Sequence, residues 1–336
     1  MLRRVASSRY LRWGLVLCAL ALAVAAFVRY WGEVRVAATE LSPWSVAGSF
    51  LAAVAGIAAS QLSWRSLLAD IGSPLPLGAS ARVFFLAQLG KYVPGSIWPF
   101  VAQVELGREH GVPRRRSATV SILTIAVSIV TGLFIAAVSL PFVSSDAARR
   151  YWWILAAAPF LAACLLPRIL NVLIGQALRL ARRPSLEAPL TRGGILQAAG
   201  WATMGWVANG THVWLIVRSI GATGPAFLTS VGAYALAWTV GFLVVFAPAG
   251  VGAREVALGA GLAPILDGGR VVLVVVVSRL LMTAGDLMWA GVGVLLGRRH
   301  AAASRDEMAA AEELRAASRR ALVAGAPPDD GALGAG

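Results

Sequence analysis

Lysine is nearly absent from this chain, and charged residues of any kind are scarce. A single lysine, Lys91, stands against twenty-nine arginines, and charged residues make up 14% of the sequence. Ordinary globular domains carry about 25% charged residues. Hydrophobic residues reach 58%, and the mean hydropathy is +0.73. These values exclude a water-soluble globule and predict a membrane protein.

Cysteine and histidine are scarce too, which limits the chemistry that the chain can perform. The two cysteines, Cys18 and Cys164, lie in separate apolar segments, so no disulfide framework or cysteine metal motif follows from them. The three histidines are far apart in sequence, and we expect His212 to pack against neighbouring helices. No paired carboxylates, nucleophile motif or metal-ligand cluster stands out. We therefore expect no cofactor and no enzyme activity.

The positive charge could suggest nucleic acid as a partner, but its distribution argues against it. The net charge is +14, yet the arginines do not gather in one domain. They separate apolar segments, as the short cytoplasmic loops of multi-pass membrane proteins do. The sequence therefore predicts a membrane partner and no nucleic acid.

The apolar segments predict an all-α, polytopic helical membrane protein. A membrane-spanning helix needs about 20 largely apolar residues. With two further apolar segments that contain breaks, we expect about seven or eight transmembrane helices. The candidate spans are residues 13–28, 44–63, 117–142, 151–166, 195–217, 225–247 and 271–296.

Arginine placement predicts the organisation of the chain in the membrane. We expect one membrane domain, 1–298, with halves 1–167 and 193–298. The basic segment 168–192 would join them, with an amphipathic piece on the anionic inner leaflet. Both termini are expected in the cytoplasm of a bacterial cell. The tail, 299–336, is expected to form a short helix followed by disorder.

Two apolar segments contain breaks that an ordinary spanning helix would not tolerate. Residues 82–106 contain Gly90, Pro94, Gly95 and Pro99, and residues 248–267 contain a glycine-rich start. Proline and glycine disfavour a continuous helix, so we expect two broken or re-entrant elements. They occupy comparable places in the two halves, which is a sequence sign of a transporter site and leaves an inverted repeat open.

The first broken element carries the only lysine next to its break. Lys91 and Tyr92 directly precede the Pro94–Gly95 step, and Trp98 follows it. An ammonium at membrane depth is costly unless it meets a carbonyl, an anion or water. One interpretation is that Lys91 donates to a phosphate or carboxylate headgroup, with its neighbours lining the site. The alternative is a lysine that reaches for the membrane surface.

The second broken element carries an adjacent pair of opposite charges, Arg254 and Glu255. Neighbouring helical residues point apart, so each needs a partner elsewhere. This favours a network between elements over a simple structural pair. Gly250 and Gly252 allow close backbone approach and leave N–H groups available for an anion.

The last span carries Arg279 and Asp286, seven residues apart. Seven residues are about two helical turns, so both side chains lie on one face. Ionisable groups in a span face the bundle interior or a water path. We expect them to belong to the functional cavity, and a buried structural pair with Arg254, Glu255 or Lys91 remains the alternative.

These motifs resemble those of a known family. Residues Leu89-Gly-Lys-Tyr-Val-Pro-Gly-Ser-Ile-Trp98 and Pro248-Ala-Gly-Val-Gly-Ala-Arg-Glu255 are similar to the two signatures of the lysylphosphatidylglycerol synthase transmembrane family, also called flippase-like proteins. The Ser278–Arg279 pair fits as well. The resemblance covers roughly residues 10–298, with Ala249 where glycine is usual. It implies the flippase-like half without a soluble aminoacyl-transferase domain.

The favoured function is the flipping of an anionic phospholipid or a polyprenyl-linked lipid across the cytoplasmic membrane. Lys91 and Arg254 would bind the headgroup, Glu255 and Asp286 would balance or gate them, and Arg279 would support the cavity. The alternative is a non-transporting partner that presents lipid to a glycosyltransferase or an aminoacyl-lipid synthase. A lipid enzyme has little support in the sequence, which also leaves the lipid and the oligomeric state open.

Overall fold

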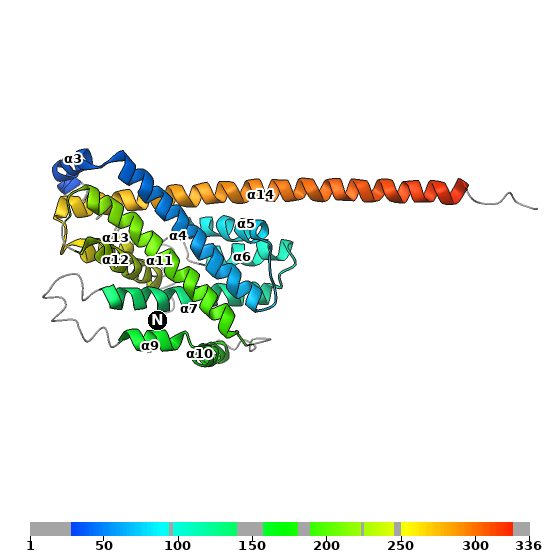
Figure 1. Cartoon of the computed structure of the whole chain (residues 1–336), viewed down its shortest axis with the longest axis horizontal. Coiled ribbons are helices and arrows are strands. Elements are labelled where there is room, and N and C mark those ends of the chain that lie inside the picture. Colours follow the sequence, from blue (N-terminus) through cyan, green and yellow to red (C-terminus); the bar gives the residue numbers. More distant parts are fainter. Residues whose placement is uncertain are drawn as a thin grey trace, which may run out of the picture.

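The computed structural model describes residues 28–93, 97–139, 157–180, 189–222, 225–244 and 250–324. Within these residues the protein is all-α, with eleven α-helices and one 3₁₀ turn (Figure 1). In chain order the elements are α3 (Trp31–Glu40), α4 (Pro43–Asp70), α5 (Leu77–Gln88), the 3₁₀ turn η1 (Leu89–Tyr92), α6 (Trp98–Glu109), α7 (Arg114–Ser139), α9 (Ala157–Cys164), α10 (Pro167–Leu180), α11 (Arg192–Ser219), α12 (Ala226–Leu243), α13 (Ala253–Leu262) and α14 (Gly268–Ala324).

Four of these helices are long and apolar enough to cross a membrane, namely α4, α7, α12 and the part of α14 up to Gly297. Helix α11 is as long as α4 and covers the predicted span 195–217, but polar residues such as Asn209 and His212 lower its hydropathy. The predicted span 13–28 lies almost wholly outside the described residues. Only the second part of the span 151–166 is described, as α9.

Helices α4 and α11 form the central pair of the fold. Two serine hydroxyls on α4 donate to backbone carbonyls of α11: Ser49 to His212 at 2.7 Å and Ser63 to Ala198 at 2.8 Å. The early residue of α4 meets the late residue of α11 and the reverse, so the two helices are antiparallel. Small and hydroxyl side chains allow such close packing between apolar helices.

Helices α5 and α6 form the first hairpin, with η1 near its tip. The two helices lie side by side (Figure 1). At the open end, the Arg82 guanidinium contacts the Glu109 carboxylate at 2.8 Å. At the tip, a β-carbon on Gly90 would lie 2.7 Å from the backbone nitrogen of Pro99. The predicted broken element 82–106 is therefore two helices folded back on each other.

Helices α12 and α13 form a second hairpin in the other half of the chain. Gly241, near the end of α12, packs against the side chain of Arg254 at the start of α13. Ala233, in the middle of α12, packs against Gly261 near the end of α13. The two helices are thus antiparallel, and the predicted break near residue 250 falls between them.

The two halves pack crosswise against each other. Helix α5 of the first hairpin packs on α14, where Phe85 stacks on Trp289 with ring centroids 4.5 Å apart. In the other half, helix α12 of the second hairpin packs on α7. Helix α14 also contacts α4, and α7 contacts α11, where the Trp206 indole donates to Thr131 at 3.0 Å. Each hairpin is therefore held by a long helix of the opposite half.

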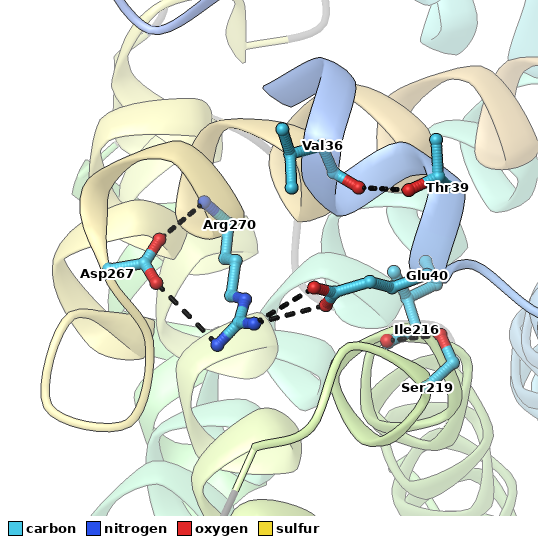
Figure 2. A network of polar contacts seen from close by, with 7 residues as sticks. All are labelled: Val36, Thr39, Glu40, Ile216, Ser219, Asp267 and Arg270. Atoms are coloured by element: carbon cyan, nitrogen blue, oxygen red, sulfur yellow. Dashed lines mark hydrogen bonds and ion pairs between the residues drawn. The ribbon is translucent and has the colours of Figure 1, made fainter. Parts of the chain in front are cut away.

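Helix α3 occupies the connection between the first two predicted spans, where no helix is predicted from the sequence. Figure 2 shows how it is fixed. Arg270, in the first turn of α14, contacts Glu40 of α3 at 3.1 Å and Asp267 at 3.7 Å. Asp267 also accepts the backbone N–H of Arg270 at 2.9 Å. These contacts fasten α3 to the start of α14.

Helix α10 and the end of α14 refine the predicted organisation of the joining segment and the tail. Helix α10 falls within the basic joining segment, as the amphipathic pattern indicates. The tail does not start a separate short helix, because α14 continues without interruption to Ala324 (Figure 1). Residues 298–324 are rich in alanine, glutamate and arginine and contain no proline or glycine, which favours helix continuation. The disorder predicted beyond Ala324 lies outside the described residues.

Candidate functional site

A cavity of about 220 Å³ lies at the junction of both hairpins and the central helices. Its wall comes from α4, α5, η1, α6, α7, α11, α12, α13 and α14. Residues from both broken elements therefore line one partly open cavity. The charged side chains among the described lining residues are Lys91, Arg254, Arg279 and Asp286.

Lys91 meets a buried carboxylate across the cavity. Its ammonium lies 2.7 Å from Asp286 Oδ2, and the Tyr92 hydroxyl donates to the same oxygen at 2.6 Å. The Asp286 side chain is only 2% exposed, and its Oδ1 has no hydrogen-bond partner in the described part of the chain. The 3₁₀ turn η1, at the tip of the first hairpin, is therefore bound to α14 through the Asp286 carboxylate.

Arg254 has a different environment. Its guanidinium donates a hydrogen bond to the Tyr234 hydroxyl of α12 and lies over the ring of that tyrosine, 4.9 Å from its centroid. Such stacking favours a cation over an aromatic face. None of the ion pairs found among the described residues includes Arg254. The arginine therefore brings positive charge to the cavity without a neutralising carboxylate there.

Glu255 and Arg279 form the third charged contact. Arg279 Nε lies 3.4 Å from Glu255 Oε1, which links the start of α13 to α14. The other oxygen of Glu255 accepts the backbone N–H of Gly252 at 2.7 Å. Arg254 and Glu255 do not pair with each other, and each contacts a different helix. The predicted network between elements is confirmed for both residues.

The glycines at the start of α13 explain how the chain makes this turn. Gly250 has φ +70° and Gly252 has φ +89°, a region that side chains with a β-carbon disfavour. Gly250 also lies against the backbone of Gly241. The Glu255 side chain then accepts the backbone N–H of Gly252 at the helix start, which is the one half of a capping box that a glycine N-cap allows. The turn aims Arg254 into the cavity and leaves Glu255 for Arg279.

The structure brings together most of the site residues predicted from sequence. Six of them line the cavity directly, Glu255 and Gly252 support it from behind, and Trp98 is 46% exposed and is not part of the described lining. Pro94 and Gly95 lie outside the described residues. The six lining residues are Lys91, Tyr92, Gly250, Arg254, Arg279 and Asp286.

Sequence reasoning missed the uncharged polar and aromatic part of the wall. Tyr234, which holds Arg254, gave no signal within an apolar helix. The hydroxyl residues of α7 did leave a signal, because Ser121, Thr124 and Ser128 recur at spacings of three and four in an apolar span. That spacing places them on one helical face. Gln103, Asn209, Trp206 and Trp238 complete this wall.

Comparison with known families decides the identity of the fold. Residues 13–290 match the family described as lysylphosphatidylglycerol synthase TM region. The chain belongs to this lysylphosphatidylglycerol synthase transmembrane family. It is accordingly a multi-pass membrane protein from a family of membrane domains linked to lipid modification. A search of curated proteins finds no match to the chain.

In this family member, His212 has a packing role that fits its sequence interpretation. Its side chain is buried, contacts the Tyr234 ring edge-on at a centroid distance of 5.0 Å, and lies 2.8 Å from the Ser278 hydroxyl. No group of three or more potential metal ligands occurs among the described residues. His212 therefore supports the tyrosine that positions Arg254.

Proposed function

We propose that the protein translocates a lipid with an anionic headgroup across the bacterial cytoplasmic membrane. The observation that supports this most is the shared cavity, in which Arg254 has no carboxylate partner among the described residues. Three cations, Lys91, Arg254 and Arg279, meet two carboxylates, Asp286 and Glu255. One positive charge is left for a ligand.

The anionic headgroup would bind first to Arg254. A guanidinium presents several N–H donors in a plane and suits the oxygens of a phosphate. Lys91 would then exchange Asp286 for the headgroup, since the Lys91 side chain is 26% exposed while the Asp286 side chain is almost fully buried. Tyr92 would stay on Asp286 and stabilise its charge when the lysine leaves. The acyl chains would remain in the bilayer.

The crosswise packing supports transport by alternating access. The helices of the two halves can be matched in chain order: α4 with α11, α5 with α12, α6 with α13 and α7 with α14. After this matching, each pair of helices in contact corresponds to another pair in contact. Since α4 and α11 are antiparallel, a two-fold axis relating the halves would lie in the membrane plane. This is the arrangement of an inverted repeat, in which one half rocks against the other around a central site.

In this proposal the two hairpins are re-entrant elements. Each would enter the membrane and return to the side from which it came, with its tip at the cavity. Broken backbone is tolerated at that depth where it is covered by protein or lines a wet cavity. Both chain termini would lie in the cytoplasm, and the protein would act without catalysing a reaction.

A reconstituted flipping assay tests the proposal. Liposomes containing the full chain would receive a fluorescent anionic phospholipid, and a membrane-impermeant quencher would report how fast it changes leaflet. Arg254→Gln should slow translocation about tenfold or more, because a desolvated charged contact is lost. Arg218→Gln is the matched control, since Arg218 also stacks on an aromatic ring, at 5.4 Å from the Trp214 centroid, but does not line the cavity.

Two outcomes would contradict the proposal. One is translocation at the same rate in the Arg254→Gln and unmodified proteins. The other is equal loss in the Arg218→Gln control, which would indicate a general effect of removing an arginine. Protein-free liposomes give the background rate for both comparisons.

The second candidate function is presentation of lipid to a separate glycosyltransferase or lipid-modifying enzyme. The length of α14 favours it, because this helix continues from the membrane segment, ending at Gly297, to Ala324. At 1.5 Å per residue the extension is roughly 40 Å long, and Figure 1 shows it projecting beyond the other helices. A stable complex with such an enzyme, together with no flipping, would favour this function.

A further inference from the structure

We infer that the anionic headgroup binds in the cavity together with one proton, which Asp286 takes up, so that the lipid is carried with a proton. This inference rests on the proposed function and names the coupling ion of the same site. It comes from the second oxygen of Asp286, which the proposal for anion binding does not use.

The two oxygens of Asp286 have different environments. The Lys91 ammonium and the Tyr92 hydroxyl both contact Oδ2, at 2.7 Å and 2.6 Å. Oδ1 is buried and has no hydrogen-bond partner among the residues that the structure describes. A carboxylic acid carries its proton on one oxygen while the other still accepts a hydrogen bond. Asp286 can therefore hold a proton on Oδ1 and keep the bond from Tyr92 on Oδ2.

The departure of Lys91 makes the neutral acid the favoured form of Asp286. A carboxylate that stays buried after its cation has left is strongly disfavoured, above all at membrane depth. Tyr92 still donates one hydrogen bond and holds the carboxylate, but a phenol brings no positive charge. A proton from water in the partly open cavity then forms an O–H bond with Oδ1 and removes the negative charge. Its release on the other side of the membrane restores the carboxylate for Lys91.

The cations on α13 and α14 are committed to other partners. Arg279 lies about two helical turns from Asp286 and is paired with Glu255 at 3.4 Å. Arg254 donates to the Tyr234 hydroxyl of α12 and is the proposed first contact of the phosphate. Neither arginine therefore replaces Lys91 at Asp286 once the headgroup is bound.

The remaining helices that pack on α14 supply no other cation to this carboxylate in the described structure. His212 of α11 is buried, 2.8 Å from a serine hydroxyl of α14. Arg65 and Arg82 are not part of the described lining, and Glu40 of α3 is bound to Arg270 at the start of α14. The residues that α4 and α5 contribute to the described lining are uncharged, namely Ile57, Ser60, Ser63, Phe84 and Gln88.

Uptake of a proton also leaves the net charge of the cavity unchanged on loading. The empty network has three cations against two carboxylates, so one positive charge is in excess. A phosphodiester monoanion and one proton together add no charge to it. Carriage of both is therefore electroneutral, whereas carriage of the lipid alone would move one negative charge through the membrane potential.

Lipid binding at different pH values tests the proton site without transport. The full chain in phosphatidylcholine nanodiscs would bind short-chain phosphatidylglycerol, whose phosphodiester stays a monoanion near neutral pH. Binding should tighten about threefold to tenfold for each pH unit of acidification, because proton and lipid affinities are reciprocally linked. Asp286→Asn, which does not titrate, should bind with equal affinity at each pH, and Asp286→Glu should restore the dependence. His212→Gln is the control and should keep the dependence, since histidine is the other side chain that titrates in this range.

Transport in liposomes tests the coupling. A pH gradient with the acidic side facing the labelled lipid should speed its movement severalfold, and a dye inside the liposomes should report acidification. A potassium–valinomycin potential without a pH gradient should leave the rate of the unmodified protein unchanged. In Asp286→Asn the potential should alter the rate and the pH gradient should not. Exchange of sodium for choline should have no effect on either protein.

The inference is overturned if lipid affinity in the unmodified protein does not change with pH, or if its dependence on pH survives in Asp286→Asn. Transport driven by the potential or by sodium, and not by the pH gradient, would also overturn it. Flipping without these pH effects would leave the proposed function in place and remove the proton. Binding that depends on pH through Asp286, with no flipping, would retain the proton site and remove the proposed function.

Discussion

At the residue scale, the cavity depends on how each charge is neutralised. Lys91 and Tyr92 share one oxygen of Asp286, whereas Arg254 relies on a tyrosine. A buried carboxylate that loses its cation is strongly destabilising, while replacement of both partners by apolar residues is often tolerated. The contribution of the Lys91–Asp286 pair to stability should therefore be separable from the contribution of Lys91 to headgroup binding.

The Lys91–Asp286 pair gives the first prediction. Lys91→Met should lower the free energy of unfolding by about 3 kcal/mol, because Asp286 would be left buried without its cation. The double variant Lys91→Met/Asp286→Leu should recover most of that loss. Its lipid translocation should remain low, since the ammonium for the headgroup is gone. Thermal unfolding in detergent and the flipping assay measure the two properties.

Two results would contradict this separation. Equal melting temperatures for the unmodified protein and the Lys91→Met variant would show that the ion pair adds no stability. Normal transport in the double variant would show that Lys91 does not contact the headgroup.

At the element scale, the turn before α13 sets the position of Arg254. Gly252→Ala should destabilise the turn by about 1–2 kcal/mol, because φ +89° is unfavourable for a residue with a β-carbon. Gly200→Ala on α11 is the control, since Gly200 has open space around it and an ordinary helical φ. That change should be neutral or slightly stabilising. A Gly252→Ala protein that melts like the control would show that the turn is not strained.

Disulfide cross-links test the motion of the halves. In a background without Cys18 and Cys164, Ala59→Cys/Gly205→Cys would join α4 to α11, where the β-carbons would lie 3.5 Å apart. Gly107→Cys/Ser117→Cys would join α6 to α7 within one half, at 3.8 Å. Both distances suit a disulfide. Oxidation should stop flipping reversibly in the first protein and spare it in the second.

The opposite pattern would contradict rocking between halves. If the cross-link within one half stops transport and the cross-link between halves does not, the hairpin moves against its own half. Addition of a reductant must restore activity in either case, which controls for damage by the substitutions.

The same elements show what sequence reasoning could and could not predict. Proline and glycine marked both breaks, and the spacing of Arg279 and Asp286 placed them on one face, because these signals are local. The contact of Arg254 with Tyr234 could not be predicted, because it depends on how distant helices pack. A buried pair of Lys91 with Asp286 is one of several pairings that the sequence leaves open, and only the packing selects it. The hydroxyl row of α7 is visible in the sequence, but its contact with Gln103 depends on the packing of α6 against α7.

At the scale of the whole molecule, the arginine distribution predicts the orientation in the membrane. Basic loops favour the cytoplasmic side, so both termini should lie there. Green fluorescent protein fused after Gly336 should fluoresce, and alkaline phosphatase fused at the same place should be inactive. An active phosphatase fusion together with a non-fluorescent green fluorescent protein fusion would show that the last span has the opposite orientation.

The central claim is that one cavity between the two hairpins receives an anionic headgroup. The most direct measurement is an experimental structure of the full chain in nanodiscs that contain phosphatidylglycerol. The account predicts a phosphate within hydrogen-bond distance of Arg254, with Lys91 shifted from Asp286 toward it. Headgroup density only on the outer surface of the helices, with Lys91 still on Asp286 and side chains alone in the cavity, would contradict it.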